Sequence, residues 1–188
     1  MVRAILEGRK TMTRRPLKIS KTAQSILDKY HVPIRSRYGD IGDRLWVKET
    51  YQRSTPDMAD GIVYRADELL RWFDGTDLNA QEKAGKLLRD GKWKPSIFMP
   101  RWASRILLEV VNVKVERLQD ITEEDAIKEG VIELDSDYCR YTFDENLLPR
   151  SSVRAAFESL WESINGKDKV KCWDTNPWVW VIEFRRVE

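Results

Sequence analysis

Residues 8–15, Gly-Arg-Lys-Thr-Met-Thr-Arg-Arg, place an amine, two hydroxyls and three guanidinium groups next to one another. A threonine hydroxyl becomes a useful nucleophile when a neighbouring base takes its proton, and a lysine acts as that base when burial or nearby positive charge lowers its pKa. Lys10 and Thr13 are therefore a candidate base and nucleophile. Arg15 is a candidate binding group, because a guanidinium holds a phosphate or a carbonyl oxygen in a forked geometry. The alternative is a solvated basic turn in which Arg15 forms a surface ion pair.

The elements around this segment decide which of its side chains can meet. Apolar residues at helical spacing predict a short helix over residues 2–6, and Gly8 stands where a left-handed cap would end it. Residues 11–15 then alternate as an extended strand does, which puts Thr13 and Arg15 on the same side. A helix end followed by such a strand predicts a small cationic pocket that contains a hydroxyl.

The overall composition is typical of a folded, soluble chain. Its 188 residues are enough to bury a core, and 34% of them are charged while 41% are hydrophobic. The net charge of +2 gives little bulk attraction for nucleic acid, so binding of that kind would have to rest on local clusters of lysine and arginine. The sequence has no apolar run long enough to cross a bilayer and no signal-peptide stretch, so we expect a cytoplasmic protein.

Cysteine and histidine are too scarce for several common kinds of site. The sequence has two cysteines, Cys139 and Cys172, no Cys-x-x-Cys pair, and one histidine, His31. A zinc site of the usual Cys/His ligands and a histidine-dependent triad are therefore not expected. We expect no metal, no other cofactor and no membrane partner.

Turn signals and apolar patterns divide the chain into strands and loops. Alternating or apolar runs predict strands at residues 44–49, 61–65, 105–116 and 178–185. The third run changes phase near Val110, which indicates a bulge or bend. Residues 19–30 are predicted as a short helix or a loop, and residues 74–91 as a loop with at most one short helix.

Two later helices are better defined by their ends. A capping box at Thr122 predicts a helix that continues to Glu129 and stops at Gly130. An apolar face predicts a second helix over residues 152–164, followed by an Asn-Gly stop. Strands with interspersed short helices favour an α+β fold built on a small curled sheet or barrel, because a closed or covered sheet has no exposed edge.

Residues 93–105 interleave aromatic rings with cations. Bases stack on aromatic faces and phosphates bind cations, so this segment could hold a nucleoside or a single strand, with Arg101 and Trp102 as the candidate binding residues. The alternative is that its prolines and Trp102 pack a loop against the sheet. Other tryptophans lie on periodic apolar faces and are expected mainly in the core, namely Trp46, Trp161, Trp178 and Trp180.

Four sequence features together resemble the ASCH domain family. They are the Gly8-x-Lys10-x-x-Thr13-x-Arg15 motif, Gly42-Asp43 before a strand, Leu118-x-x-Ile121-Thr122 leading a helix to Glu129, and the last strand with Val181-Ile182-Glu183-Phe184. The resemblance implies the ASCH fold, a small PUA-like β-barrel, here with flanking helices. It also implies one domain over residues 1–188, with inserted loops at about 52–100 and 133–174.

One branch of that family consists of small bacterial amidohydrolases that deacetylate N4-acetylcytidine, and their N-terminal motif is similar to residues 5–15. Matched residue by residue, the resemblance implies that Lys10 is the proton acceptor, Thr13 the nucleophile and Glu129 the proton donor. The predicted place of Glu129 at a helix C-terminus suits a donor, because the negative end of the helix dipole disfavours a carboxylate there. The alternative for Glu129 is an ordinary solvated helix residue.

The chain is longer than those amidohydrolases and is most similar to the longer ASCH-like proteins frequent in phages and prophages, whose biochemical role is generally unassigned. The first hypothesis is an amidohydrolase acting on an N4-acylated cytosine nucleoside, with Arg15, Arg101 and Trp102 binding the substrate. The second is a non-catalytic module that binds RNA or a modified nucleotide, with Lys10 and Arg15 on the phosphate. A metal-independent ribonuclease is ranked last.

Overall fold

The computed structural model describes residues 1–17, 35–53, 61–66, 70–72, 77–78, 92–134, 140–143 and 149–187. The chain divides into two compact units. The first unit consists mainly of Arg3–Leu45 and Leu108–Val187, and the second mainly of Trp46–Leu107. The features predicted at residues 19–30, most of those at 74–91, and the residues Cys139 and His31 lie outside the described residues.

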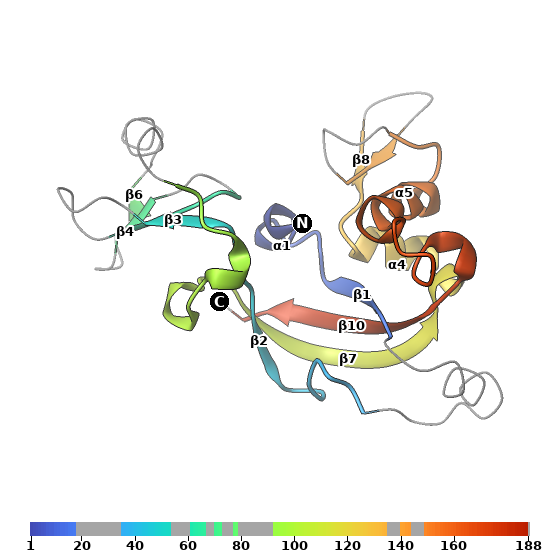
Figure 1. Cartoon of the computed structure of the whole chain (residues 1–188), viewed down its shortest axis with the longest axis horizontal. Coiled ribbons are helices and arrows are strands. Elements are labelled where there is room, and N and C mark those ends of the chain that lie inside the picture. The colour runs from blue at the N-terminus through green and yellow to red at the C-terminus, as the bar shows by residue number, and fades with distance from the viewer. Residues whose placement is uncertain are drawn as a thin grey trace. The chain divides into compact units, whose positions relative to one another are not determined.

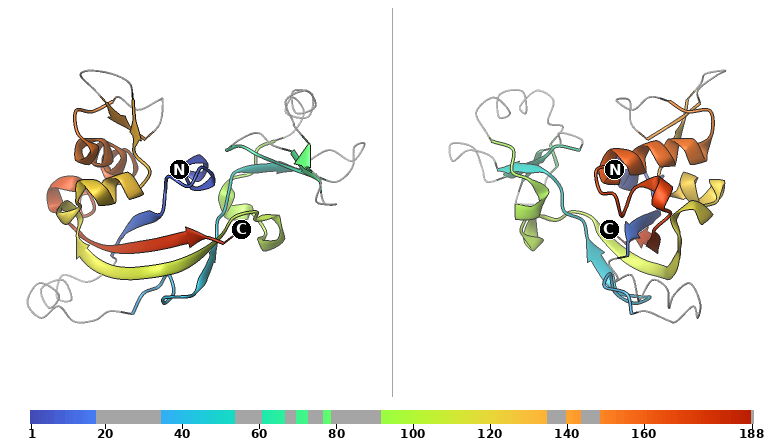
Figure 2. Two further views of the ribbon diagram at one scale, coloured as in Figure 1. Left: turned by 180° about the vertical axis from the view of Figure 1, so that it is seen from behind. Right: turned by 45° about the vertical axis from the view of Figure 1, so that its right-hand side comes forward.

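The first unit is built on a four-stranded sheet in the order β1-β10-β7-β2. The two central strands, β10 (Trp178–Arg186) and β7 (Leu107–Arg117), are long and antiparallel, and both curve along their length (Figure 1). Strand β1 (Met12–Pro16) pairs antiparallel with β10, and β2 (Arg44–Trp46) lies beyond β7. Figure 2 shows the same curvature of β7 and β10 from two further directions. All four strands fall within or beside the runs that the sequence predicts.

The predicted change of phase near Val110 is a β-bulge. Glu183 of β10 pairs with Asn112, whereas the next residue, Phe184, pairs with Val110. Val111 is therefore the extra residue of β7, and the alternation of side chains reverses there. The bulge explains why the apolar pattern of β7 shifts from even positions before Val111 to odd positions after it.

The helices of the first unit begin and end at the predicted signals. Helix α1 (Val2–Leu6) is followed by Gly8 at φ +73°, and α4 (Glu123–Lys128) is followed by Gly130 at φ +103°. Thr122 caps α4 by accepting a hydrogen bond from the Asp125 amide at 3.1 Å. In the same way Ser152 caps α5 (Val153–Asn165).

The two faces of the sheet carry different apolar clusters. On one face, Val179 and Val181 of β10 pack with buried residues of α4 and α5. On the other face, Trp180 and Ile182 pack with Val110 of β7. Since successive side chains of a strand point to opposite faces, alternate residues of β10 divide between the two clusters. The strand is nearly continuous in apolar residues because both of its faces are buried.

Both units also contain shorter helices and strands. The first also contains η3 (Leu118–Asp120), η4 (Trp173–Thr175) and a hairpin of β8 (Ile132–Glu133) and β9 (Tyr141–Thr142). The second contains a sheet in the order β3-β4-β5-β6, formed by Tyr51–Arg53, Gly61–Tyr64, Leu70–Trp72 and Asp77–Leu78. Two 3-10 helices, η1 (Ser96–Phe98) and η2 (Arg101–Ala103), follow it in sequence. Its core cluster is Tyr51, Ile62, Tyr64, Met99 and Ala103.

The expected α+β class is therefore confirmed, with a curled antiparallel sheet and few helices. Closure of that sheet into a PUA-like barrel of the ASCH type stays a prediction, as does the description of residues 1–188 as one domain with two insertions. Of the tryptophans expected in the core, Trp161, Trp178 and Trp180 are buried, whereas Trp46 is only half-buried. None of the helices in the described part of the chain combines the length and the apolar character that crossing a bilayer requires.

Candidate functional site

The segment of residues 9–11 lies against the C-terminal end of α4. The backbone amide of Thr11 donates to the Lys128 carbonyl at 2.9 Å, and the Arg9 guanidinium donates to the Gly130 carbonyl at 3.0 Å. The last carbonyls of a helix have no partner within the helix, so a cationic segment that donates to them is well placed there. This docking brings the predicted base next to the residue that ends α4.

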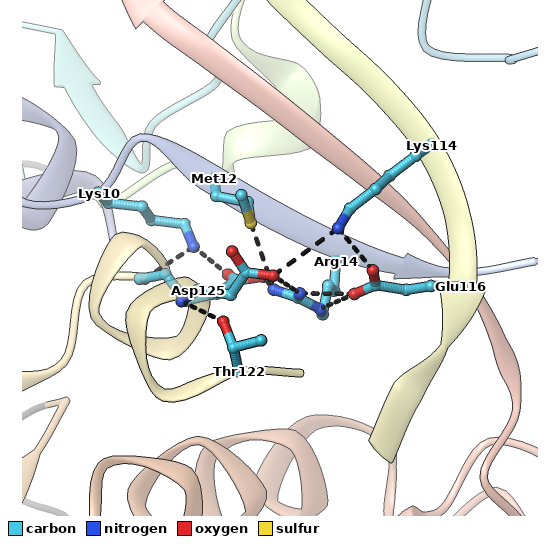
Figure 3. A network of polar contacts seen from close by, with 8 residues as sticks. Lys10, Met12, Arg14, Lys114, Glu116, Thr122 and Asp125 are labelled. Atoms are coloured by element: carbon cyan, nitrogen blue, oxygen red, sulfur yellow. Dashed lines mark hydrogen bonds and ion pairs between the residues drawn. The ribbon is translucent and has the colours of Figure 1, made fainter. Parts of the chain in front are cut away.

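Lys10 and Glu129 form a buried ion pair. The Lys10 Nζ lies 2.5 Å from Glu129 Oε2 and also donates to the main-chain carbonyl of Glu129 at 2.8 Å. The two side chains are 4% and 3% exposed. Figure 3 shows the Lys10 side chain extending toward α4. The structure thus brings together two of the three residues in the predicted catalytic set.

Burial lowers the pKa of Lys10 below its ordinary value of 10.5. The loss of hydration penalises the charged amine most, and the neighbouring guanidinium groups of Arg15 and Arg14 act in the same direction. The carboxylate of Glu129 opposes this change and does not cancel it. An amine in this setting gives up its proton more readily than an exposed lysine does.

Glu129 keeps one oxygen that the described residues leave without a hydrogen bond. Its Oε1 atom is buried, and the Arg14 Nη1 lies 3.6 Å from it, beyond hydrogen-bonding distance. A buried carboxylate oxygen with no donor is costly, so such an atom commonly receives a water or a ligand. The Oε1 atom is therefore the point of this network with unused acceptor capacity.

Arg14 holds the remaining carboxylates of the network (Figure 3). Its Nη2 lies 2.6 Å from Glu116 Oε1 and 2.6 Å from Asp125 Oδ2, and its Nε donates to the same Glu116 oxygen at 3.1 Å. The guanidinium also lies 5.9 Å from the centre of the Phe157 ring. A fully buried guanidinium is stable when several carboxylates and a ring surround it in this way.

Lys114 adds a third cation to the contacts of this network. Lys114 on β7 contacts Glu116 Oε2 at 2.8 Å and lies 3.9 Å from Asp125 Oδ2. Three cations thereby meet three carboxylates, namely Lys10, Arg14 and Lys114 with Glu116, Asp125 and Glu129.

Thr13 and Arg15 lie on the other side of β1. Thr13 pairs with Ile182 and Arg15 with Trp180, both on the sheet face that packs with Val110. Arg14, between them, pairs with Val181 on the face that carries α4 and α5. Strand alternation therefore separates the Thr13 hydroxyl from the side of β1 that faces Glu129. The predicted roles of Thr13 as nucleophile and of Arg15 as binding group stay predictions.

Arg101 and Trp102 belong to the second unit, in helix η2. Trp102 is 61% exposed, and the Arg101 guanidinium lies 5.8 Å from the centre of the Trp46 ring. The interleaving of rings and cations that the sequence indicates is thus present at the surface of this unit. A role of these residues in binding a substrate stays a prediction.

Sequence reasoning did not identify Arg14, Lys114, Glu116 or Asp125 as members of the network. One signal was available, because Lys114 and Glu116 are two residues apart on a predicted strand and must share a face. Nothing in the pattern of residues 11–15 showed which of two neighbouring arginines is buried.

The described residues contain no group of three or more His, Cys, Asp or Glu side chains arranged to hold a metal ion. The carboxylates of the network instead face lysine and arginine. Comparisons with protein-family models, with curated proteins and with solved structures find no match to this chain.

Proposed function

We propose that this chain is an amidohydrolase that removes the acyl group from an N4-acylated cytosine nucleoside, with Lys10 and Glu129 as its proton-transferring pair. The observation that carries the proposal is the buried contact of 2.5 Å between the Lys10 amine and the Glu129 carboxylate. General acid–base catalysis needs an acceptor and a donor that both reach the same bond of the substrate, and the contact between Lys10 and Glu129 supports this because it places the two groups side by side. The substrate class comes from the resemblance of residues 5–15 and of Glu129 to the N4-acetylcytidine amidohydrolases.

The pair can complete a proton cycle without any external acid or base. The cycle starts when a proton passes from the Lys10 ammonium to Glu129 across their contact of 2.5 Å, which leaves a free amine beside a carboxylic acid. Lys10 takes a proton from the attacking hydroxyl group, and Glu129 gives its proton to the nitrogen of the leaving cytosine. The acyl carbon gains the hydroxyl oxygen and loses that nitrogen. After turnover Lys10 is again an ammonium and Glu129 a carboxylate, which is the ion pair from which the cycle began.

The attacking group in this proposal is a water molecule next to Lys10. Water fits the placement of Thr13 on the Ile182 side of β1, away from the side of the strand that faces Glu129. The Oε1 atom of Glu129, which accepts no hydrogen bond from the described residues, is available to that water or to the leaving amine. The resemblance assigns the attack to Thr13 instead. Attack by Thr13 forms an acyl-enzyme and attack by water does not, so detection of an acyl group on Thr13 distinguishes the two mechanisms.

The test is the release of cytidine from N4-acetylcytidine by the purified full chain. Glu129→Gln keeps the shape of the side chain and removes the donated proton, so we expect the rate to fall by roughly 10²–10⁴-fold. Glu124→Gln, at the exposed start of the same helix, is the matched control and should keep the wild-type rate. Thr13→Ala should also keep most of the rate if water attacks. An acyl group trapped on Thr13 of the wild type would show that the threonine attacks instead.

An inactive wild-type chain on a panel of N4-acylated nucleosides would overturn the proposal. Binding of the nucleoside without cleavage would then leave the pair as part of a non-catalytic binding module. Equal loss of activity in Glu129→Gln and Glu124→Gln would also count against the assignment, because only the first removes a group of the buried pair.

A further inference from the structure

The second unit carries a surface where exposed aromatic and apolar side chains lie among cations. We call it the aromatic–cation surface, and it consists of Trp46, Lys48, Ile97, Phe98, Arg101 and Trp102. Ile97, Phe98 and Trp102 are 70%, 69% and 61% exposed, although they fall within six consecutive residues of a folded segment. Three large apolar side chains so exposed and so close together indicate an interaction site rather than scattered surface residues.

The exposure follows from how this segment is anchored. Met99 and Ala103 are 3% exposed and belong to the core cluster of the unit, so their neighbours Phe98 and Trp102 are turned outward. The Tyr64 hydroxyl donates to the Ala103 carbonyl at 2.7 Å, which fixes the end of η2. The outward rings are therefore presented on a fixed backbone, and a ligand that stacks on them needs to order little of the protein.

The cations gather on the same surface through Trp46. The Lys48 amine lies 4.9 Å from the centre of the Trp46 ring and donates to the Ile97 carbonyl at 3.3 Å. The Arg101 guanidinium lies 5.8 Å from the same ring. Besides Arg101, residues 92–104 contain two lysines, Lys92 and Lys94, and no acidic residue. The surface thus combines exposed rings with positive charge, in a segment that itself carries no acidic residue.

We propose that the aromatic–cation surface binds a single-stranded nucleic acid, with unpaired bases stacked on Phe98 and Trp102 and backbone phosphates near Lys48 and Arg101. Unpaired bases stack on any exposed ring, and a groove or patch of cations follows the phosphate backbone. A duplex hides its base faces, so it can use the cations and cannot use the rings. The inference does not depend on the proposed hydrolysis, because its residues belong to the second unit and the Lys10–Glu129 pair to the first.

The test is binding of a short fluorescent oligouridylate to the full chain, followed by anisotropy at several salt concentrations. Trp102→Ala should weaken binding by roughly 5- to 150-fold, the range that corresponds to the loss of one base–ring stack. Trp102→Phe keeps an aromatic ring and should retain most of the wild-type affinity. Arg101→Ala and Lys48→Ala should each reduce the slope of log affinity against log salt by about 0.7, because each removes one phosphate contact. A duplex of matched length should bind more weakly than the single strand.

Matched controls come from the first unit. Val170→Ala removes an apolar side chain that is 72% exposed, and Lys169→Ala removes the exposed cation beside it. Both should bind the oligouridylate as the wild type does. Glu129→Gln should also bind normally, which keeps a failure of the hydrolytic proposal distinct from a failure of this one. No binding by the wild type, an unchanged affinity of Trp102→Ala, or equal affinity for duplex and single strand would overturn the proposal.

Discussion

Gly130 lies so close to Lys10 that a Cβ added to the glycine would be 3.2 Å from the Cβ of Lys10. The same added atom would lie 3.2 Å from the Cβ of Ala4 in α1. Gly130 also adopts φ +103°, a backbone conformation that L side chains rarely adopt. Two features therefore favour a glycine after Glu129: the backbone conformation that ends α4, and the close approach of Lys10 and Ala4.

Gly130→Ala should destabilise the protein by about 1–3 kcal/mol, since it combines a strained backbone with a tight contact. Gly8→Ala is the matched comparison, because Gly8 has φ +73° and an added Cβ there meets nothing within 4 Å. Urea unfolding of both variants should show the larger loss for Gly130→Ala, and the difference between them measures the contact with Lys10 and Ala4. An equal loss in the two variants would assign the whole effect to the backbone.

Arg14→Lys keeps the charge of the buried network and removes its forked geometry. We expect a loss of about 2–4 kcal/mol in the free energy of unfolding, because one ammonium cannot replace the contacts of the guanidinium with Glu116 and Asp125. Lys114→Ala, whose side chain is 48% exposed, should cost less than about 1 kcal/mol. Chemical denaturation measures both, and a larger loss for Lys114→Ala would contradict the central place of Arg14.

The pH dependence of stability should report the burial of Lys10. Because burial lowers the pKa of Lys10 in the folded state, the unfolded chain binds this proton more strongly, and the contribution of Lys10 to stability rises with pH up to about its ordinary pKa of 10.5. The difference in unfolding free energy between the wild type and Lys10→Met should therefore increase across the alkaline range. A wild-type advantage that decreases with pH would contradict burial as the dominant cause.

Glu49→Gln should destabilise the second unit selectively. The Glu49 carboxylate is 1% exposed and binds Arg105 through two hydrogen bonds, at 3.0 and 2.9 Å. Glutamine carries no charge opposite the Arg105 guanidinium and accepts only one of these two bonds with its oxygen, which we expect to cost about 3 kcal/mol. Hydrogen exchange should increase in Trp46–Leu107, the second unit. Glu109→Gln is the control: it breaks an ion pair with Arg185, whose side chain is 68% exposed, and should cost less than about 1 kcal/mol.

The local signals of the sequence predicted the elements well where a single residue fixes the geometry. Thr122 and Gly130 bound α4 because a cap and a left-handed glycine act on the adjacent backbone alone. The bulge beside Val110 was visible because the reversal of alternation is itself a local pattern. Such features need no knowledge of the tertiary partner.

The candidate site depended on partners distant in sequence, and there the prediction was incomplete. Lys10 and Glu129 were paired by the resemblance to a family rather than by any pattern within the chain. In β1 the arginines at 14 and 15 are equivalent to a sequence reader, and the packing of α4 and α5 against one face of the sheet decides that Arg14 is buried. The face of a strand is set by what covers it, and that information lies in other elements.

Strand β1 hydrogen-bonds to β10 in the described sheet, and these two strands are joined by most of the polypeptide. During synthesis on the ribosome, Lys10 and Arg14 therefore emerge long before the strand that holds β1 in place. Bringing such distant segments together is the slow part of folding, since the intervening chain must be closed into a loop. The unit that contains the candidate site should consequently remain open to chaperones and proteases until β10 has left the exit tunnel.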